Sequence, residues 1–185
     1  QGWQPFVLEA LLADQSAPQP LPTVADADAG QFVDYVLRYV RRLRGGSVDR
    51  ARALVAPYLA RIERQAVAGD AEQRARAMHT LGLFAAGHYA ALLTTALQDN
   101  SPLVAMTAAR ALAATGDTRH IPALLDALPR FALWETRYLA ALLTPGGAAA
   151  TPQLRACLTD AQLPPHTRRV AAEALARLHD FAAAD

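Results

Sequence analysis

The sequence predicts an all-α fold built from short stacked helices. Of its 185 residues, 43 are alanine and 27 are leucine, whereas the β-branched and aromatic residues that favour strands are sparse. Apolar residues recur at helical spacing from Gln31 onward. A segment near the middle of the chain is also repeated near its end. Together these observations argue against an all-β fold and against a disordered chain.

Residues 1–30 are predicted to be an N-terminal arm and a linker. A short apolar segment, residues 3–12, precedes residues 13–30, which carry Pro18, Pro20 and Pro22. Prolines at alternate positions prevent helix formation, so we expect this linker to be extended. Because the chain begins with Gln1 and not with methionine, we expect a processed product or a piece of a longer protein.

Residues 31–70 are predicted to form a basic cap of two helices. The first helix carries an apolar stripe made of Phe32, Val36, Tyr39, Val40 and Leu43. Gly45 and Gly46 are expected to end it, and Ser47 is placed to cap the next helix. Pro57 lies inside the second helix, where its missing N–H should kink or divide the helix.

The positive charge of the chain is concentrated in this cap. Residues 35–76 carry ten arginines against four acidic residues, whereas residues 1–34 carry five acidic residues and no arginine. The basic patch consists of Arg38, Arg41, Arg42 and Arg44. It is interpreted as a solvated helix face, a membrane-surface contact, a nucleic-acid contact or a partner of the acidic arm. The absence of a base-reading element disfavours nucleic acid.

Residues 71–185 contain an internal repeat of helix pairs. Segment 108–117 (AARALAATGD) matches segment 171–180 (AAEALARLHD) at six of ten positions, a shift of 63 residues. Shorter matches near residues 96, 127 and 157 give a half-step of about 31 residues, long enough for two helices and two turns. We therefore expect about four units, with the last one truncated.

Prolines, glycines and small polar residues mark the expected ends of these helices. Four prolines each precede an apolar run, in the first-turn position where a missing N–H costs nothing: Pro102, Pro122, Pro152 and Pro165. Ser101 and Thr151 stand one residue earlier as expected N-caps. Gly116 and the pair at residues 146–147 are expected to follow helix ends. The uncharged stretch at residues 77–98 is interpreted as two short buried helices, not as a membrane span.

Segment 99–128 resembles a HEAT repeat of the short bacterial kind. The residues that carry the resemblance are Asp99, Pro102, Val104, Ala108, Ala109, Ala111, Leu112, Gly116, Asp117, Ile121, Pro122, Leu124, Leu125 and Leu128. The resemblance implies a right-handed α-solenoid of short HEAT-like helix pairs behind the N-terminal cap. It also implies a scaffold that binds another protein, in the cytoplasm, with the soluble domain of a membrane-anchored bacterial protein as an open alternative.

In such a solenoid the second helices, around residues 88–98, 122–128 and 152–158, would form the groove for the partner. The candidate partner-binding residues are Trp134, Glu135, Arg137 and Tyr138. Two interpretations stay open for them. Trp134 could fill a gap between repeats while Arg137 pairs with Glu135 or a neighbour, or the cluster could clamp a ligand.

No catalytic residue, metal site or cofactor is predicted. The five histidines lack the spacing of metal ligands, and no glycine-rich phosphate loop is present. The lone Cys157 lies on an apolar stretch and is expected to be a small core residue. HEAT-like enzymes of the bilin-lyase or DNA-glycosylase type remain the alternative to a non-catalytic scaffold.

Overall fold

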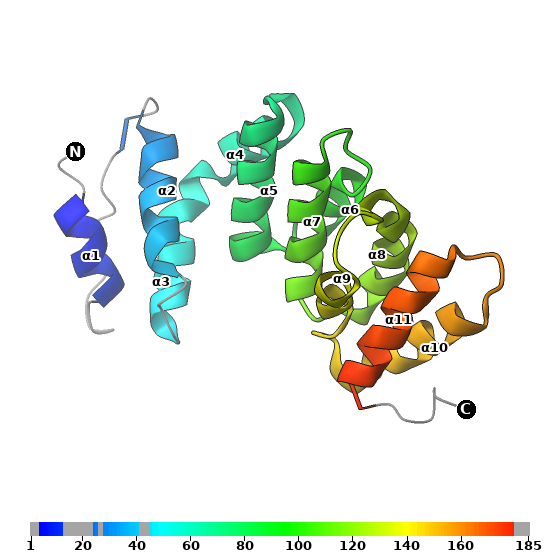
Figure 1. Cartoon of the computed structure of the whole chain (residues 1–185). Coiled ribbons are helices and arrows are strands. Elements are labelled where there is room, and N and C mark those ends of the chain that lie inside the picture. The colour runs from blue at the N-terminus through cyan, green and yellow to red at the C-terminus, as the bar shows by residue number, and fades with distance from the viewer. Residues whose placement is uncertain (1–3, 13–23, 26–27, 41–44, 180–185) are drawn as a thin grey trace. The chain divides into compact units, whose positions relative to one another are not determined.

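The structure is a computed structural model that describes residues 4–12, 24–25, 28–40 and 45–179 (Figure 1). These residues form helices and turns, with no strand among them, which confirms the all-α prediction. They divide into two compact units, Gln1–Arg64 and Gln65–Asp185.

The first unit is organised around α3 (Gly46–Val55), which packs against α1 (Gln4–Leu12) and α2 (Ala29–Val40). Its buried apolar side chains include Val7, Leu11, Phe32, Val36, Val40, Leu54 and Val55. The predicted stripe is thus confirmed at Phe32, Val36 and Val40, whereas Leu43 and most of the predicted linker lie outside the described residues.

The helix predicted to contain Pro57 is divided there. It ends at Val55, continues through the 3₁₀ turn η1 (Ala56–Tyr58) and resumes as α4 (Leu59–Ala68). The predicted cap at Ser47 is wrong, because α3 already begins at Gly46 and Gly45 takes the N-cap position. Gly45 has φ +56°, a conformation that glycine adopts without a Cβ penalty, so the helix starts before the serine.

The second unit is a stack of helix pairs, which confirms the solenoid-like fold. The first helices are α5 (Ala71–Ala85), α7 (Pro102–Ala114), α9 (Thr136–Leu143) and α11 (Pro165–Arg177). Each of them packs against the next one along the chain. The second helices are α6 (Ala90–Ala96), α8 (Ile121–Ala127) and α10 (Thr151–Thr159). Three 3₁₀ turns connect these helices: η2 (Thr118–His120) precedes α8, η3 (Leu128–Phe131) follows α8, and η4 (Gly147–Ala150) precedes α10.

The predicted period of 63 residues is present in the helix boundaries. Pro102 and Pro165 begin α7 and α11, which also end 63 residues apart. Two predicted caps fail in part: Thr151 lies inside α10, after Ala150 in the N-cap position, and Ser101 is an N-cap whose side chain makes no capping bond. A proline fixes its own φ, whereas a capping hydroxyl depends on the shape of the whole turn.

The turn after α7 has the predicted chemistry. Gly116 has φ +66°, as expected for a glycine that follows a helix end. Asp117 accepts a hydrogen bond from the backbone N–H of Arg119 at 2.9 Å. The side-chain and backbone hydrogen bonds of Arg119 lower the pKa of Asp117 to about 2, so its carboxylate stays charged and holds this turn.

The first helices α5 and α7 approach each other closely at one glycine. A Cβ atom on Gly82 would lie 2.3 Å from the Cβ atom of Ala111, which no packed structure tolerates. The missing side chain of Gly82 therefore sets the distance between these two helices. The stretch at residues 77–98 is divided between α5 and α6, as predicted. None of the described helices combines the length and the apolar character of a membrane span.

Candidate functional site

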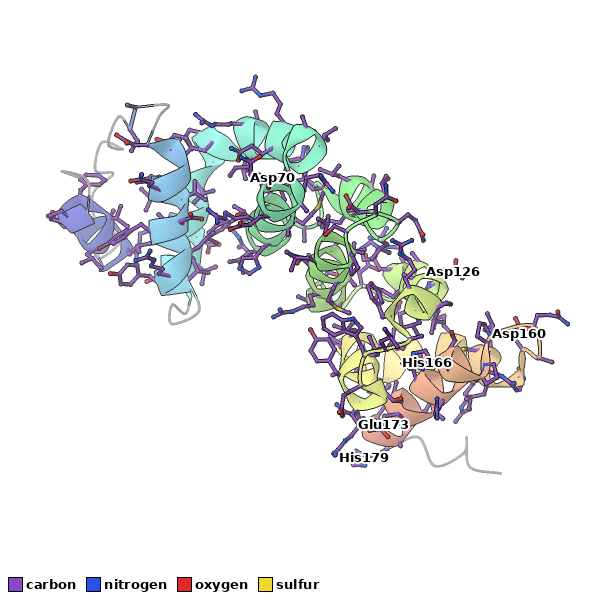
Figure 2. All side chains as sticks on the ribbon, turned by 45° about the horizontal axis from the view of Figure 1, so that its top comes forward. Asp70, Asp126, Asp160, His166, Glu173 and His179 are labelled. Atoms are coloured by element: carbon purple, nitrogen blue, oxygen red, sulfur yellow. The ribbon has the colours of Figure 1, made fainter. Side chains whose placement is uncertain are left out.

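Side chains that could carry acid–base or metal chemistry are spread along the second unit. Figure 2 shows Asp126 on α8, Asp160 after α10 and Glu173 on α11. His166 and His179 lie near the two ends of α11. Across the described ranges, no three histidine, cysteine or acidic side chains come together as a metal cluster.

Cys157 is a buried residue of α10, as predicted. Burial, and secondly the charge of Asp160, raise the pKa of its thiol. A raised pKa keeps the thiol protonated, whereas the nucleophilic form of cysteine is the thiolate. The environment of Cys157 therefore suits packing and not covalent chemistry.

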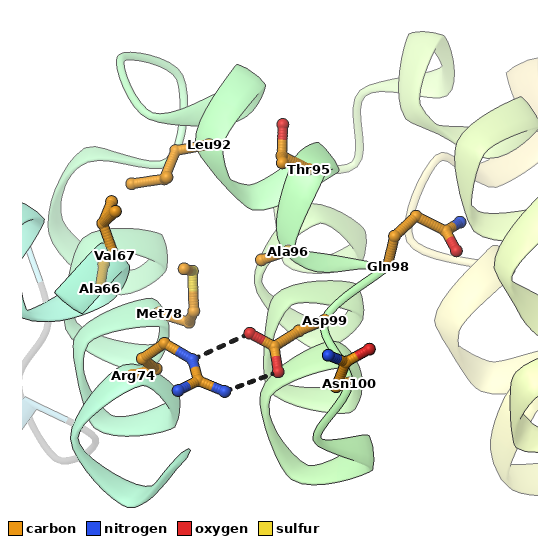
Figure 3. Close-up of a pocket in the computed structure, with 10 residues that line it drawn as sticks. All are labelled: Ala66, Val67, Arg74, Met78, Leu92, Thr95, Ala96, Gln98, Asp99 and Asn100. Carbon is orange, nitrogen blue, oxygen red and sulfur yellow. Dashed lines mark hydrogen bonds and ion pairs between the residues drawn. The ribbon is translucent and has the colours of Figure 1, made fainter. Parts of the chain in front are cut away.

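The second unit contains an open cleft of about 540 Å³ (Figure 3). One wall is the end of α4 with Ala66 and Val67, and the other is α6 with Leu92, Thr95 and Ala96. Arg74 and Met78 of α5 line it as well, as do Gln98, Asp99 and Asn100 of the turn before α7. The cleft thus lies beside α6, at residues 88–98 of the predicted partner groove. It also uses α4, which the sequence analysis assigned to the cap.

The turn between α4 and α5 shapes this cleft. A Cβ atom on Gly69 would lie 2.6 Å from the carbonyl oxygen of Gln65, so this sharp turn requires glycine. Asp70 then begins α5 with a capping box. Its carboxylate accepts from the Gln73 backbone N–H at 2.8 Å, and the Gln73 side chain accepts from the Asp70 backbone N–H at 3.0 Å.

An ion pair closes one end of the cleft. Arg74 donates to Asp99 through Nε and Nη2, both at 2.9 Å, and through Nη1 to the carbonyl oxygen of Gly69 at 2.9 Å (Figure 3). Asp99 also accepts from the backbone N–H of Ser101 at 2.8 Å. The hydrogen bond from Arg74 holds the pKa of Asp99 below its usual value. Each charge is thus matched by its partner, and the rest of the lining is apolar or uncharged.

The same turn is tied to the following repeat. Arg130 of η3 donates a hydrogen bond from Nη2 to the carbonyl oxygen of Asp99. Asp99 therefore connects three parts of the stack: α5 through Arg74, the N-cap position of α7 through Ser101, and η3 through Arg130. This arrangement fixes the cleft end of the turn between α6 and α7.

Of the four predicted partner-binding residues, Arg137 and Tyr138 lie in the first turn of α9, a first helix, and Trp134 and Glu135 lie just before it. The Trp134 and Tyr138 rings have centroids 5.5 Å apart, and Trp134 also contacts Phe131 at 6.4 Å. The Nε atom of Arg137 lies 3.9 Å from Oε1 of Glu173 on α11. Glu135 takes the N-cap position of α9 without a side-chain capping bond. The structure therefore brings these residues together on the first-helix layer, and their role in binding stays a prediction.

The exposure of two apolar residues was not predicted from the sequence. Leu133 is fully exposed beside Trp134, and Val67 of the cleft is 68% exposed. Neither position carries a signal in the sequence, because leucine and valine at helical spacing or in a short turn are ordinary core residues. Their exposure becomes visible only in the folded chain, where the surrounding helices leave both side chains in solvent.

The predicted basic patch lies mostly outside the described residues. Arg38 is exposed in the last turn of α2, whereas Arg41, Arg42 and Arg44 are not among the residues described. The patch therefore remains a prediction from the sequence.

Comparison with known proteins gives one family. A family model described as HEAT repeats matches residues 55–144, a range that includes α4 and the whole cleft. No curated protein and no solved structure matches the chain. HEAT repeats generally bind other proteins and generally act as non-catalytic scaffolds. The sequence match and the stacked helix pairs agree: residues 55–144 of this chain match the HEAT-repeat family, and the described residues have the all-α, solenoid-like fold that such repeats form.

Proposed function

We propose that this chain is a non-catalytic protein-interaction scaffold that holds a segment of a partner protein in the cleft beside α6. The observation that carries the proposal is the cleft itself, an opening of about 540 Å³ within the HEAT-repeat segment. Its walls offer Val67 and Leu92 to a ligand, with the buried side chain of Met78 behind them.

The lining indicates an uncharged, apolar anchor on the partner. Arg74 and Asp99 already satisfy each other, so neither has an unmatched charge to offer. Burying one aliphatic side chain against such walls contributes about 1.5–3 kcal/mol. Asn100 at the turn adds an amide that can hydrogen-bond to the backbone of an extended segment.

The test is capture of the partner from a lysate of the source organism, with variants of two exposed cleft residues. Val67→Glu places a charge on the wall of α4, and Thr95→Arg places one on α6. Both side chains are exposed, so the folded chain tolerates the changes. Leu103→Glu is the matched control, because Leu103 is 55% exposed and does not line the cleft.

The expected result is a defined protein that the wild type and Leu103→Glu retain and that both cleft variants lose. A partner retained equally by all four chains would overturn the assignment of the cleft. Recovery of nucleic acid or lipid in place of a protein would overturn the proposed function.

A further inference from the structure

A second surface is formed by the turn before α9 and the start of that helix. Of the five large apolar side chains that are exposed among the described residues, three lie within six consecutive positions: Leu133, Trp134 and Tyr138. Their exposed fractions are 102%, 42% and 38%. Folded proteins rarely gather such side chains on a surface without a binding role.

The two rings of this surface are held in place from below. Trp134 and Tyr138 are tilted by 31° at 5.5 Å, and the ring of Phe131, which is 2% exposed, meets Trp134 edge-on. Because the two exposed rings already contact each other, they leave no slot between them for a cation or a nucleic-acid base. They present one apolar platform.

The platform continues along α9 at helical spacing. Tyr138 and Ala141 are exposed one turn apart on α9, whereas Leu139, Ala140 and Leu143 form its buried face. Trp134 lies in the turn just before the helix, with its ring against that of Tyr138. Residues 136–141 of α9 span about 8 Å of helix axis, and Trp134 extends the surface beyond the N-terminal end of the helix. The small side chain of Ala141 allows another helix to approach closely, so the surface suits a helix of two to three turns.

The charge beside the platform favours an acidic ligand. The Arg137 side chain is 80% exposed, and its contact with Glu173 is long, at 3.9 Å. Glu173 also accepts from Nε of Arg177 at 3.2 Å, so one carboxylate serves two guanidinium groups. Glu135 lies outside the helix, at the N-cap position of α9, and its carboxylate makes no capping bond there. A carboxylate of a ligand next to Arg137 would give each of the two guanidinium groups, Arg137 and Arg177, its own acidic partner.

We propose that the α9 surface, defined as Leu133, Trp134, Arg137, Tyr138 and Ala141, binds an amphipathic helix of another protein. The apolar stripe of that helix packs on Trp134 and Tyr138, and an acidic residue beside the stripe pairs with Arg137. This surface is separate from the cleft residues, so its binding does not depend on the function proposed for the cleft.

The experiment is a selection from a phage-displayed library of 16-residue helical peptides on the immobilised chain. The affinity of the enriched peptides is then measured in solution with a Trp3→Phe variant, in which Trp134 is the remaining tryptophan of the sequence. Trp134→Ala, Leu133→Ala and Arg137→Gln are compared with the control Leu103→Ala. Leu133→Ala removes a fully exposed side chain, so it leaves folding intact, and circular dichroism checks each variant.

The expected peptides carry apolar residues at helical spacing and a neighbouring carboxylate, and they shift Trp134 fluorescence to shorter wavelength. Trp134→Ala and Leu133→Ala should each weaken binding at least tenfold, Arg137→Gln about tenfold, and Leu103→Ala not at all. The proposal is overturned if no peptide is enriched, if the enriched peptides are basic, or if their affinity is the same for Trp134→Ala. A single-stranded oligonucleotide that binds with the same dependence on Trp134 would also overturn it.

Discussion

The helices α7 and α11 have the same length and matching sequences, yet they are buried differently. Three matched pairs are buried in both: Ala108 and Ala171, Ala111 and Ala174, Leu112 and Leu175. Two further pairs of alanines differ, because Ala109 and Ala113 are buried on α7 while Ala172 and Ala176 are exposed on α11.

The neighbours of each helix explain this difference. Helix α7 packs between α5 and α9 and against α6, whereas the described neighbours of α11 are α9, α10 and η3. The repeated sequence therefore determines which faces of a helix can be buried. The position in the stack determines which of them are buried.

The largest expected change in stability comes from a charge on the helix face that is buried on α7 and exposed on α11. Ala109→Glu should lower the free energy of unfolding by about 3 kcal/mol or more, because Ala109 is 1% exposed and the carboxylate would have no partner. The matched change Ala172→Glu should stay within about 0.5 kcal/mol, since that position is exposed. Urea unfolding of both variants measures the difference. Equal losses would show that the two faces are not distinguished by burial.

A smaller effect is expected from the glycine against which α7 packs. Gly82→Ala should destabilise the chain by about 1–3 kcal/mol through the clash with Ala111, although alanine is the better helix former. Gly87→Ala is the control, because a Cβ atom there meets nothing within 4 Å. The double variant with Ala111→Gly should recover stability in thermal unfolding. A stabilising effect of Gly82→Ala alone would contradict the close approach of α5 and α7.

The smallest effect concerns the turn that precedes α7. Asp99 is tied to Arg74, whereas the residue 63 positions later, before α11, is Gln162. The pKa of Asp99 is lowered in the folded chain, so its carboxylate stabilises the fold above the ordinary pKa of about 3.9. This contribution is lost as the pH falls through the lowered pKa.

Asp99→Asn should therefore reduce stability at pH 7, and the difference from the wild type should shrink below about pH 4. Gln162→Asn, the matched change before α11, should show no such pH dependence. Urea midpoints at pH 7, 4 and 3 measure both variants. A difference for Asp99→Asn that grew on acidification would contradict the ion pair.

The sequence predicted the features that a single residue determines. Pro57 divides a helix and Pro102 begins one. Both effects are local, because the missing N–H of proline acts on its own turn, whatever the rest of the chain packs against. Gly116 and Asp117 form the expected turn for the same kind of reason. Capping was predicted less well: Gly45 took the place expected for Ser47, because the course of the preceding turn decides which residue flanks the helix.

The surfaces were predictable only in part. The sequence placed a groove along the second helices, and the cleft does use α6, but its other wall is α4, outside the predicted repeats. Trp134 and Tyr138 were recognised from their residue types, while their place at the N-terminal end of a first helix followed from the order of the helices in space. Leu133 is fully exposed in the turn before α9, and periodicity does not encode the course of such a turn.

Because α7 and α11 have matching boundaries, the segment that runs from one to the other can be treated as a repeating module. Residues 102–164 run from the start of one helix to the residue before its counterpart, and that counterpart packs on α9 and α10 as α7 packs on α5 and α6. A second copy of this segment inserted after Pro164 would join at equivalent positions on both sides. Such an insertion would lengthen the stack by two repeats and duplicate the α9 surface, while the cleft beside α6 would keep its single copy.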